Sequence, residues 1–436
     1  MHSTDPDLPF GVALFIILGL LGTAALYLTK QHRATLKMQV ELLWVALAVR
    51  FLASVVIYEF GMVNVLGDED ASGWVGGVGF YESWTRKGFG LLDLPSLLAG
   101  AFEGHHRGYY YMLGGLFFVT DSPARLPAAA LNCFFGALTV VFAYRIAQSL
   151  FSEWVAVRVG WVACFFPSLI VWSAQTVKEP VVILLETVAL YGCVKLKLSG
   201  FSLKYILLCA AAILLVIPFR FYAAYIAGAA VLFSLLLPQF GKSKVSVGSA
   251  IAVLALLIPT LAMSGILVRH EAELEKFNLS RIQRFKEDVG VDQGSAVEVR
   301  YDLESPAGFA AALAIGGAHL LLAPFPWQMG GSLRMILTGP EVVVWWWLVL
   351  VGLAPGLWYA LRTRFNEIQP LLIFLFGLGL LYSLMFGNIG LIYRQRAQLL
   401  PWLLIFAVVG LERRMIRRVA ARRARMNPPV LAEAPR

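Results

Sequence analysis

The sequence is organised by a series of apolar runs, each about as long as a membrane is thick. A helix needs about 20 mostly apolar residues to cross the hydrocarbon core of a bilayer. We count eleven such runs, at 10–29, 42–65, 126–147, 155–175, 180–197, 201–217, 222–238, 246–267, 342–361, 370–387 and 397–411. With 59% apolar and 14% charged residues, the chain differs strongly from a soluble domain. The pattern predicts an all-α polytopic membrane protein.

Basic residues set the expected orientation and domain organisation. Lys and Arg concentrate in cytoplasmic loops, and the main basic groups all fall on that side if the N-terminus is outside. We expect one transmembrane domain over 1–411 and a basic cytoplasmic tail over 412–436. Two outer loops, 66–125 and 268–307, belong to that domain. The segment 308–340 should be re-entrant or interfacial, since proline and glycine interrupt it and the span parity keeps it outside.

The net charge has one main source. Of the formal +9, seven arginines between 413 and 425 supply +7, which leaves +2 for all other residues. A basic segment directly after a span suits anionic lipid headgroups, so the charge indicates membrane lipids as partners and no nucleic acid. The sequence also lacks phosphate-loop and dinucleotide-binding motifs, which argues against ATP-driven transport. We place the chain in a bacterial inner membrane.

An acidic cluster directly follows the second apolar run. Asp68, Glu69 and Asp70 bring three carboxylates to the expected outer surface. Repulsion between them favours protonation of one carboxyl group, which suits proton transfer. The alternative is a solvated acidic turn. Asp68 and Asp70 also match a short carboxylate pattern that suits Mg²⁺ or Mn²⁺.

Several charged residues lie at the expected outer ends of later spans. Lys178 and Glu179 stand in a short turn before one span, Arg220 in another turn, and Arg394 and Arg396 just before the last span. Arginine is suited to bidentate phosphate recognition. Cations on the outer side oppose the usual charge bias, so we expect an anionic ligand. The alternatives are contact with lipid phosphate and, for the Lys178–Glu179 turn, a simple interfacial ion pair.

Other polar residues are weaker candidates. Four residues of the first outer loop are candidate substrate contacts: Arg86, His105, His106 and Arg107. Three ionisable residues lie inside apolar runs: Arg50, Glu59 and Glu186. Each either pairs with another group in the protein core or belongs to a transport pathway.

The order of these features resembles the GT-C superfamily of integral membrane glycosyltransferases. The likeness is to the branch of protein O-mannosyltransferases, aminoarabinose transferases and lipopolysaccharide sugar transferases. Its most telling stretch is 109–185, which contains YYYMLGGLFF and WVACFFPSLIVWSAQTVKEPVVILL. The likeness covers 42–240 and, more loosely, the C-terminal third. One departure is the additional span at 10–29, because relatives usually place the acidic loop after their first span.

The resemblance implies a GT-C-like bundle of about 11 transmembrane helices. It also implies transfer of a sugar from a polyprenyl-phosphate donor to a hydroxyl of a glycan, lipid or protein at the outer face. Asp68 or Asp70 then corresponds to the catalytic base and Glu179 to a second acid, where many relatives have Asp. The residues expected to hold the lipid phosphate are Lys178, Arg220, Arg394 and Arg396. No cofactor is required, and a divalent metal is optional.

Two other functions remain open from the sequence. A polysaccharide polymerase or ligase that uses lipid-diphosphate glycans would need the same arginines. A lipid or solute transporter should show repeat symmetry and broken spans near the middle of the membrane. In this sequence the ionisable groups gather mainly at one face, which favours an enzyme.

Overall fold

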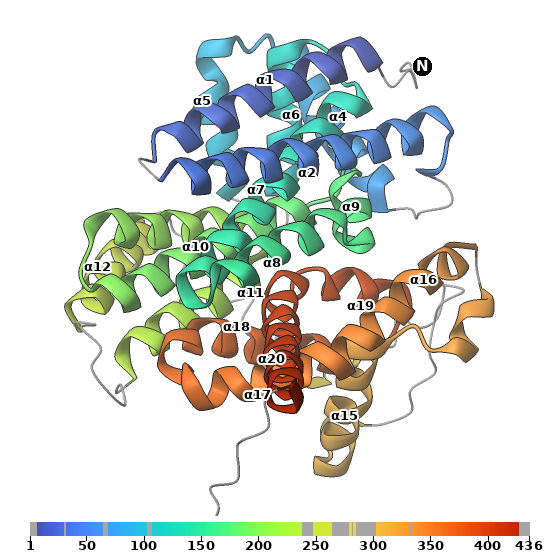
Figure 1. Cartoon of the computed structure of the whole chain (residues 1–436). Helices are drawn as coiled ribbons and strands as arrows, with labels where there is room; N and C mark the ends of the chain where they lie inside the picture. Colours follow the sequence, from blue (N-terminus) through green and yellow to red (C-terminus); the bar gives the residue numbers. More distant parts are fainter. Residues whose placement is uncertain are drawn as a thin grey trace, which may run out of the picture.

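The computed structural model describes residues 7–29, 32–63, 69–102, 107–237, 247–263, 279–280, 282–284, 302–331 and 333–426. These residues form helices and connecting turns, and none of them forms a strand (Figure 1). The helices are α1 (Leu8–Tyr27), α2 (Arg33–Glu59), α4 (Glu69–Arg86), α5 (Leu94–Ala99), α6 (Gly108–Thr120), α7 (Arg125–Leu150), α8 (Glu153–Phe165), α9 (Pro167–Ser173), α10 (Glu179–Ser199), α11 (Leu203–Leu236), α12 (Val247–Met263), α15 (Pro306–Leu322), α16 (Leu333–Leu348), α17 (Ala354–Thr363), α18 (Phe365–Leu384), α19 (Ile389–Arg396) and α20 (Leu400–Met426). Short 3₁₀ or π segments add η1 (Leu91–Asp93), η2 (Gly100–Phe102), η3 (Pro326–Gly331) and η4 (Val349–Leu353).

Six helices of the described part are long and apolar enough to cross a membrane, or seven if the bent pair α8–α9 is one span. They are α1, α2, α7, α11, the continuous stretch Thr338–Thr363, and α18. Helices α10 and α20 are as long, but every stretch of 18 residues in either of them holds at least three charged residues. The all-α membrane class is therefore supported, whereas the count of eleven spans is not confirmed.

Helix α11 reverses direction in its middle. The backbone of Arg220 is not helical (φ −157°, ψ 82°). Cys209, before this break, donates from its thiol to the carbonyl oxygen of Ala189 at 3.3 Å. Val231, after the break, accepts at 3.8 Å from Cys193, one turn further along α10. Both halves of α11 thus pack along the same stretch of α10, in agreement with two separate runs in the sequence.

The bend between α8 and α9 depends on a buried arginine. The two helices meet at 56°, and Pro167 prevents the last carbonyl groups of α8 from finding helical partners. Arg50 of α2 supplies these partners. Its Nη1 donates to the carbonyl oxygen of Cys164 and its Nη2 to that of Ala163, both at 3.1 Å. Arg50, which is 1% exposed, therefore has a structural role as the cap of α8.

Polar contacts define two ends of the bundle. At one end, Arg145 of α7 donates to Gln39 of α2 at 2.7 Å, and Lys197 of α10 donates to Gln369 of α18 at 2.7 Å. We call this the Lys197 end. The opposite ends of α2, α7, α10 and α18 meet around Glu179, and we call this the Glu179 end. Polar residues from helices far apart in the sequence thus gather at two opposite ends of the bundle.

The segment between α15 and α16 breaks where the sequence predicts it. Helix α15 ends at Leu322, and the short η3 follows before α16 begins. Four expected helix breakers lie in this connection: Pro324, Pro326, Gly330 and Gly331. With 17 residues, the apolar helix α15 is shorter than the helices that can span. Its expected re-entrant or interfacial position stays a prediction.

Candidate active site

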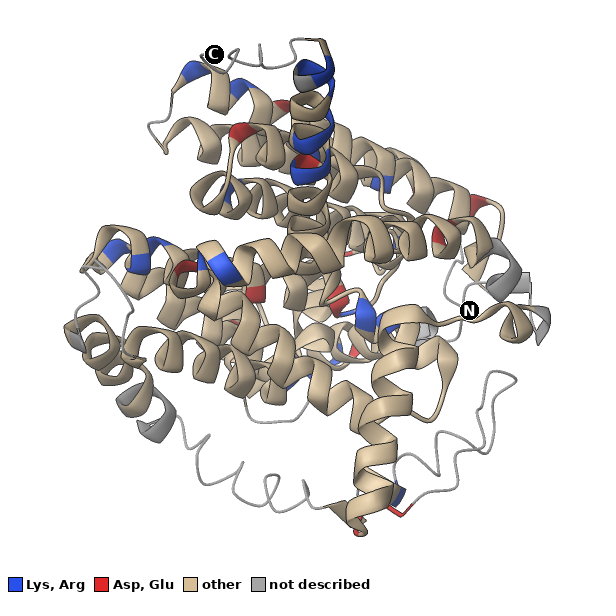
Figure 2. Ribbon diagram, turned by 60° about the horizontal axis from the view of Figure 1, so that its bottom comes forward, with Lys and Arg blue, Asp and Glu red and all other residues tan. Residues whose placement is uncertain are grey.

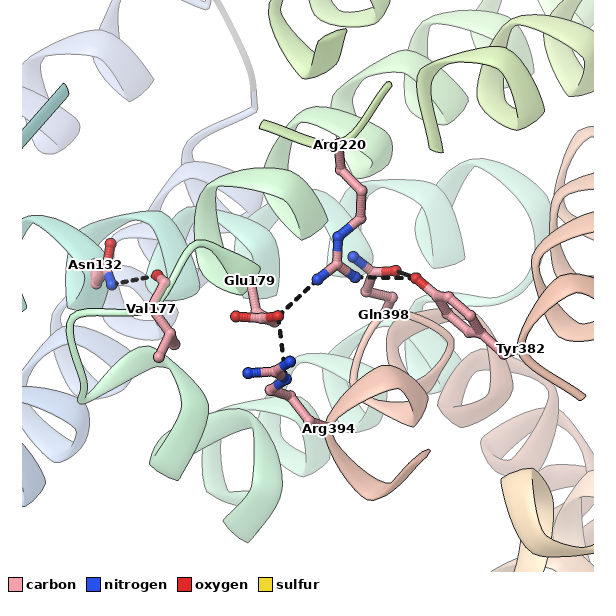
Figure 3. A network of polar contacts seen from close by, with 7 residues as sticks. All are labelled: Asn132, Val177, Glu179, Arg220, Tyr382, Arg394 and Gln398. Atoms are coloured by element: carbon pink, nitrogen blue, oxygen red, sulfur yellow. Dashed lines mark hydrogen bonds and ion pairs between the residues drawn. The ribbon is translucent and has the colours of Figure 1, made fainter. Parts of the chain in front are cut away.

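A short non-helical turn leads into the site. It joins α9 to α10 and ends at Glu179. Asn132 of α7 donates from its side chain to the carbonyl oxygen of Val177 at 2.8 Å (Figure 3). The hydroxyl oxygen of Tyr58 in α2 accepts from the backbone N–H of Thr176 at 3.1 Å. Buried backbone groups outside a helix need such partners, so these two side chains hold the turn in position.

Glu179 is the centre of a buried charge cluster. One carboxylate oxygen accepts from Arg220 Nη2 at 2.7 Å and lies 3.4 Å from Arg394 Nε (Figure 3). The side chains of Glu179, Arg220 and Arg394 are 1%, 4% and 10% exposed. Two guanidinium groups favour the ionised carboxylate. One negative and two positive charges leave this cluster with a net charge of +1.

A tyrosine fixes the position of Arg220. Arg220 Nη1 donates to the hydroxyl oxygen of Tyr382 at 3.0 Å. The Tyr382 hydroxyl in turn donates to the side-chain oxygen of Gln398 (Figure 3). The amide nitrogen of Gln398 is buried and has no hydrogen-bond partner among the described residues. The chain of contacts therefore leaves one buried donor available beside the cluster.

The two arginines near the last span are separated in space. Arg394 reaches Glu179, whereas Arg396 donates from Nη1 to the carbonyl oxygen of Ala323 at 2.7 Å. Arg396 also lies against the ring of Tyr393, at 4.8 Å from its centroid. Positions i and i+2 point to nearly opposite sides of a helix, which explains the separation. Nε and Nη2 of Arg396, a side chain only 1% exposed, have no hydrogen-bond partner in the described part.

The beginning of α4 lies beside the turn that leads to Glu179. A Cβ atom at Gly73 would stand 2.1 Å from the carbonyl oxygen of Thr176, so only glycine fits. Glu69 and Asp70 form the first turn of α4, where the structure describes their backbone alone. Asp68 lies outside the described residues. The helix that the acidic cluster begins is therefore packed next to the Glu179 turn.

The remaining predicted residues occupy different places. Lys178 is the N-cap residue of α10 and is partly exposed. Arg107 is the N-cap residue of α6, whose first residue packs against Pro218 near the α11 break. Arg86 ends α4, about 27 Å from its start, and pairs with Glu82 at 3.1 Å.

Two predicted histidines and the predicted metal site concern the first outer loop. His105 and His106 lie outside the described residues. Within the described part, no group of three metal-ligating side chains comes together. Asp68 and the side chain of Asp70, which were expected to bind a metal, are not among the described groups. The metal prediction therefore remains a prediction.

Two more ionisable residues of the apolar runs have distinct surroundings. Glu59 ends α2 and is exposed. Glu186 lies two turns after Glu179 in α10 and is fully buried. Neither carboxyl oxygen of Glu186 has a hydrogen-bond partner among the described residues.

Sequence reasoning missed the residues that hold the charges in place. Asn132 and Tyr382 lie inside apolar runs, where they looked like parts of ordinary spans. A buried amide in the middle of a span needs partners, so Asn132 was a detectable signal. Tyr382 gave no comparable signal in the sequence, since tyrosine is common near membrane surfaces.

Comparison with known proteins gives no family assignment. No protein-family model matches the chain, and no curated protein matches it. One solved structure with some similarity is the archaeal oligosaccharyltransferase AglB from Archaeoglobus fulgidus, in complex with an inhibitory peptide and a dolichol-phosphate. The match covers 89% of this chain and 52% of that chain, with 12% sequence identity and a TM-score of 0.44. This chain thus spans about half the length of AglB, and a similarity at this level establishes neither fold family nor function. What the residues themselves define is a helical membrane protein with a buried cationic cluster at one end.

Proposed function

We propose that the chain is a membrane glycosyltransferase that moves a sugar from a polyprenyl-phosphate donor to an acceptor hydroxyl. The observation that carries the proposal is the convergence of Arg220 and Arg394 on Glu179. Their net charge of +1 lies in a buried position, where a phosphate would be attracted strongly. Lys178, next to Glu179, adds a further cation at the edge of the cluster.

The proposed chemistry divides between two sets of groups. The acceptor oxygen attacks the anomeric carbon of the sugar, and the bond from that carbon to the phosphate oxygen breaks. Arg394 and Arg220 stabilise the negative charge that the departing lipid phosphate gains. The acceptor proton passes to Asp68 or Asp70 as general base. No nucleotide is needed, because the phosphate is already an activated leaving group.

Glu179 has a positioning role in this scheme. Its carboxylate contacts two arginines, so it is poorly placed to act as an acid or base. It holds both guanidinium groups and balances one of their charges. Arg396 can contribute the N–H groups of Nε and Nη2 to the donor, although it lies outside the Glu179 cluster.

The cellular setting follows the orientation expected from the sequence. In this proposal the Glu179 end faces the periplasm of a bacterial inner membrane, and the Lys197 end faces the cytoplasm. The acceptor is a glycan, lipid or protein hydroxyl, and Mg²⁺ or Mn²⁺ is optional. A polymerase or ligase that uses lipid-diphosphate glycans is the alternative enzyme.

Transfer from a purified polyprenyl-phosphate sugar to membrane acceptors tests the proposal. Arg394→Ala should lower the rate at least a hundredfold, in the range found when a charge-stabilising donor is removed. Arg423→Ala, on the exposed tail of α20, should leave it unchanged. Flux of solute across vesicles without sugar transfer would identify a transporter instead.

A further inference from the structure

The Lys197 end of the bundle contains a large cavity between α17 and α20. Its volume is about 490 Å³. The residues that define its character are four arginines and two aromatic residues: Arg362, Arg413, Arg414, Arg417, Trp358 and Tyr359. None of the described residues that line it is acidic, and together they carry a formal charge of +4. Figure 2 shows the basic turns that follow one another along α20 toward the C-terminus.

Two of these arginines are held in fixed positions by aromatic rings. Arg362 lies 4.0 Å from the ring centroid of Trp358, and Arg413 lies 3.7 Å from that of Tyr359. Arg413 also donates to the hydroxyl oxygen of Tyr359. A guanidinium over a ring face is attracted to the ring and can still donate N–H groups to an anion. The Arg413 Nε is buried and has no hydrogen-bond partner among the described residues.

The nearest carboxylate of α20 does not neutralise the cavity. Glu412, beside Arg413, is 7% exposed and points to another side of the helix. Its carboxylate accepts a hydrogen bond from the hydroxyl of Ser152, at the start of α8. Glu412 is therefore engaged away from the arginines of the cavity.

A second cavity of about 430 Å³ lies on the adjacent face of α20. It shares Arg414 with the first cavity and adds Arg418 and Arg422. Trp347 and Met415 line its apolar part. The two cavities thus form one cationic surface with two places for a phosphate group.

The surroundings favour a lipid over a soluble anion. The apolar stretch Thr338–Thr363, long enough to span a membrane, ends at the first cavity. Trp358 is 58% exposed, Trp347 51% and Leu350 73%. Such side chains suit the contact between acyl chains and headgroups, and basic pockets at the end of transmembrane helices bind lipid phosphates.

We propose that these two cavities form a binding site for an anionic phospholipid, and that a phospholipid with two phosphate groups occupies both. The first phosphate contacts Arg362, Arg413 and Arg417, and the second contacts Arg418 and Arg422. Arg414 lies between them. The site is at the opposite end of the bundle from Glu179, so it does not depend on the proposed transferase function.

Lipid retention by the purified full-length chain in detergent, measured by native mass spectrometry, tests the proposal. The probes are a two-phosphate phospholipid, a one-phosphate anionic phospholipid and a zwitterionic phospholipid. The affinity should decrease in that order. Each arginine near a lipid phosphate contributes about fivefold, so Arg362→Gln together with Arg417→Gln should weaken retention about 25-fold. Both side chains are exposed, and their replacement leaves the buried packing intact.

Arg423→Gln is the matched control, since Arg423 is an exposed arginine of the same helix that lines neither cavity. It should retain the lipid as the unchanged chain does. Equal weakening by Arg423→Gln would show general charge attraction and overturn the site. Equal retention of the zwitterionic lipid, or displacement of the two-phosphate lipid by millimolar inorganic phosphate, would overturn the choice of ligand. The assay contains no sugar donor, so its outcome is separate from that of the transfer assay.

Discussion

Replacement of Glu179 by glutamine tests the charge cluster most directly. The carboxylate is 1% exposed and contacts two guanidinium groups at 2.7 and 3.4 Å. Glutamine keeps the size of the side chain but removes its charge, so both buried arginines lose the carboxylate that they contact. Breaking a buried ion pair in this way costs about 3–5 kcal/mol. The unfolding equilibrium should therefore shift by at least on the order of a hundredfold.

The assay is reversible unfolding of the purified chain in mixed micelles of a mild detergent and SDS. Glu82→Gln provides a matched control, since Glu82 pairs with Arg86 at 3.1 Å on the exposed side of α4. An exposed pair of this kind contributes about 0.3–0.5 kcal/mol. If both variants lose the same small amount of stability, the Glu179 cluster does not have the role assigned to it.

A double-mutant cycle separates the cluster from general damage. Combining Glu179→Gln with Arg394→Gln removes one positive charge together with the negative one. The coupling energy should be about 1–3 kcal/mol, with the double variant more stable than the sum of the single changes predicts. Strict additivity would mean that the 3.4 Å contact between the two side chains has no energetic weight.

Three further predictions concern other parts of the fold. Gly73→Ala should displace the start of α4 and lower sugar transfer at least tenfold, whereas Gly79→Ala, where a Cβ meets open space, should have no effect on the transfer rate. Asp68→Asn and Asp70→Asn should be compared in the same assay, and full activity in both would remove the base assignment. Arg50→Ala should lower the free energy of unfolding by about 3 kcal/mol, because two buried carbonyl groups lose their donors; an unchanged unfolding midpoint would contradict the capping role.

The sequence predicted where the helices break better than it predicted the number of membrane spans. The break near Arg220 was readable because a proline and a charged residue interrupt an apolar run. The predicted number of eleven spans is not confirmed. One reason is that α10 and α20 are long enough to span a membrane but contain several charged residues. Hydropathy alone does not reveal whether those charges are paired inside the protein. Arg50 illustrates the point, since two of its partners are backbone carbonyl groups more than 100 residues away in sequence.

The charged residues of the site could be predicted from the sequence, but the contacts between them could not. Arg220, Glu179 and Arg394 each stood out, because ionisable groups at the ends of spans need a reason. Their pairing was not visible, since it depends on how α10, α11 and α19 meet. The position of Arg396 could have been foreseen from helix geometry, which turns it away from Arg394. Whether Asp68 reaches the cluster stays a prediction.

The net charge of the Glu179 cluster bears on which lipid-linked donor it can bind. Glu179 cancels one of the two guanidinium charges, so the buried cluster presents a net +1. A sugar linked through one phosphate is a phosphodiester with a single negative charge, whereas a diphosphate-linked glycan carries two. We infer that the cluster matches the monophosphate donor better, because a second negative charge would depend on a cation outside the cluster, such as Lys178 at its edge. A competition assay with both donors checks this inference: the monophosphate donor should be used in preference. Preference for the diphosphate donor would instead favour the polymerase or ligase, with Lys178 or Arg396 as the additional cation.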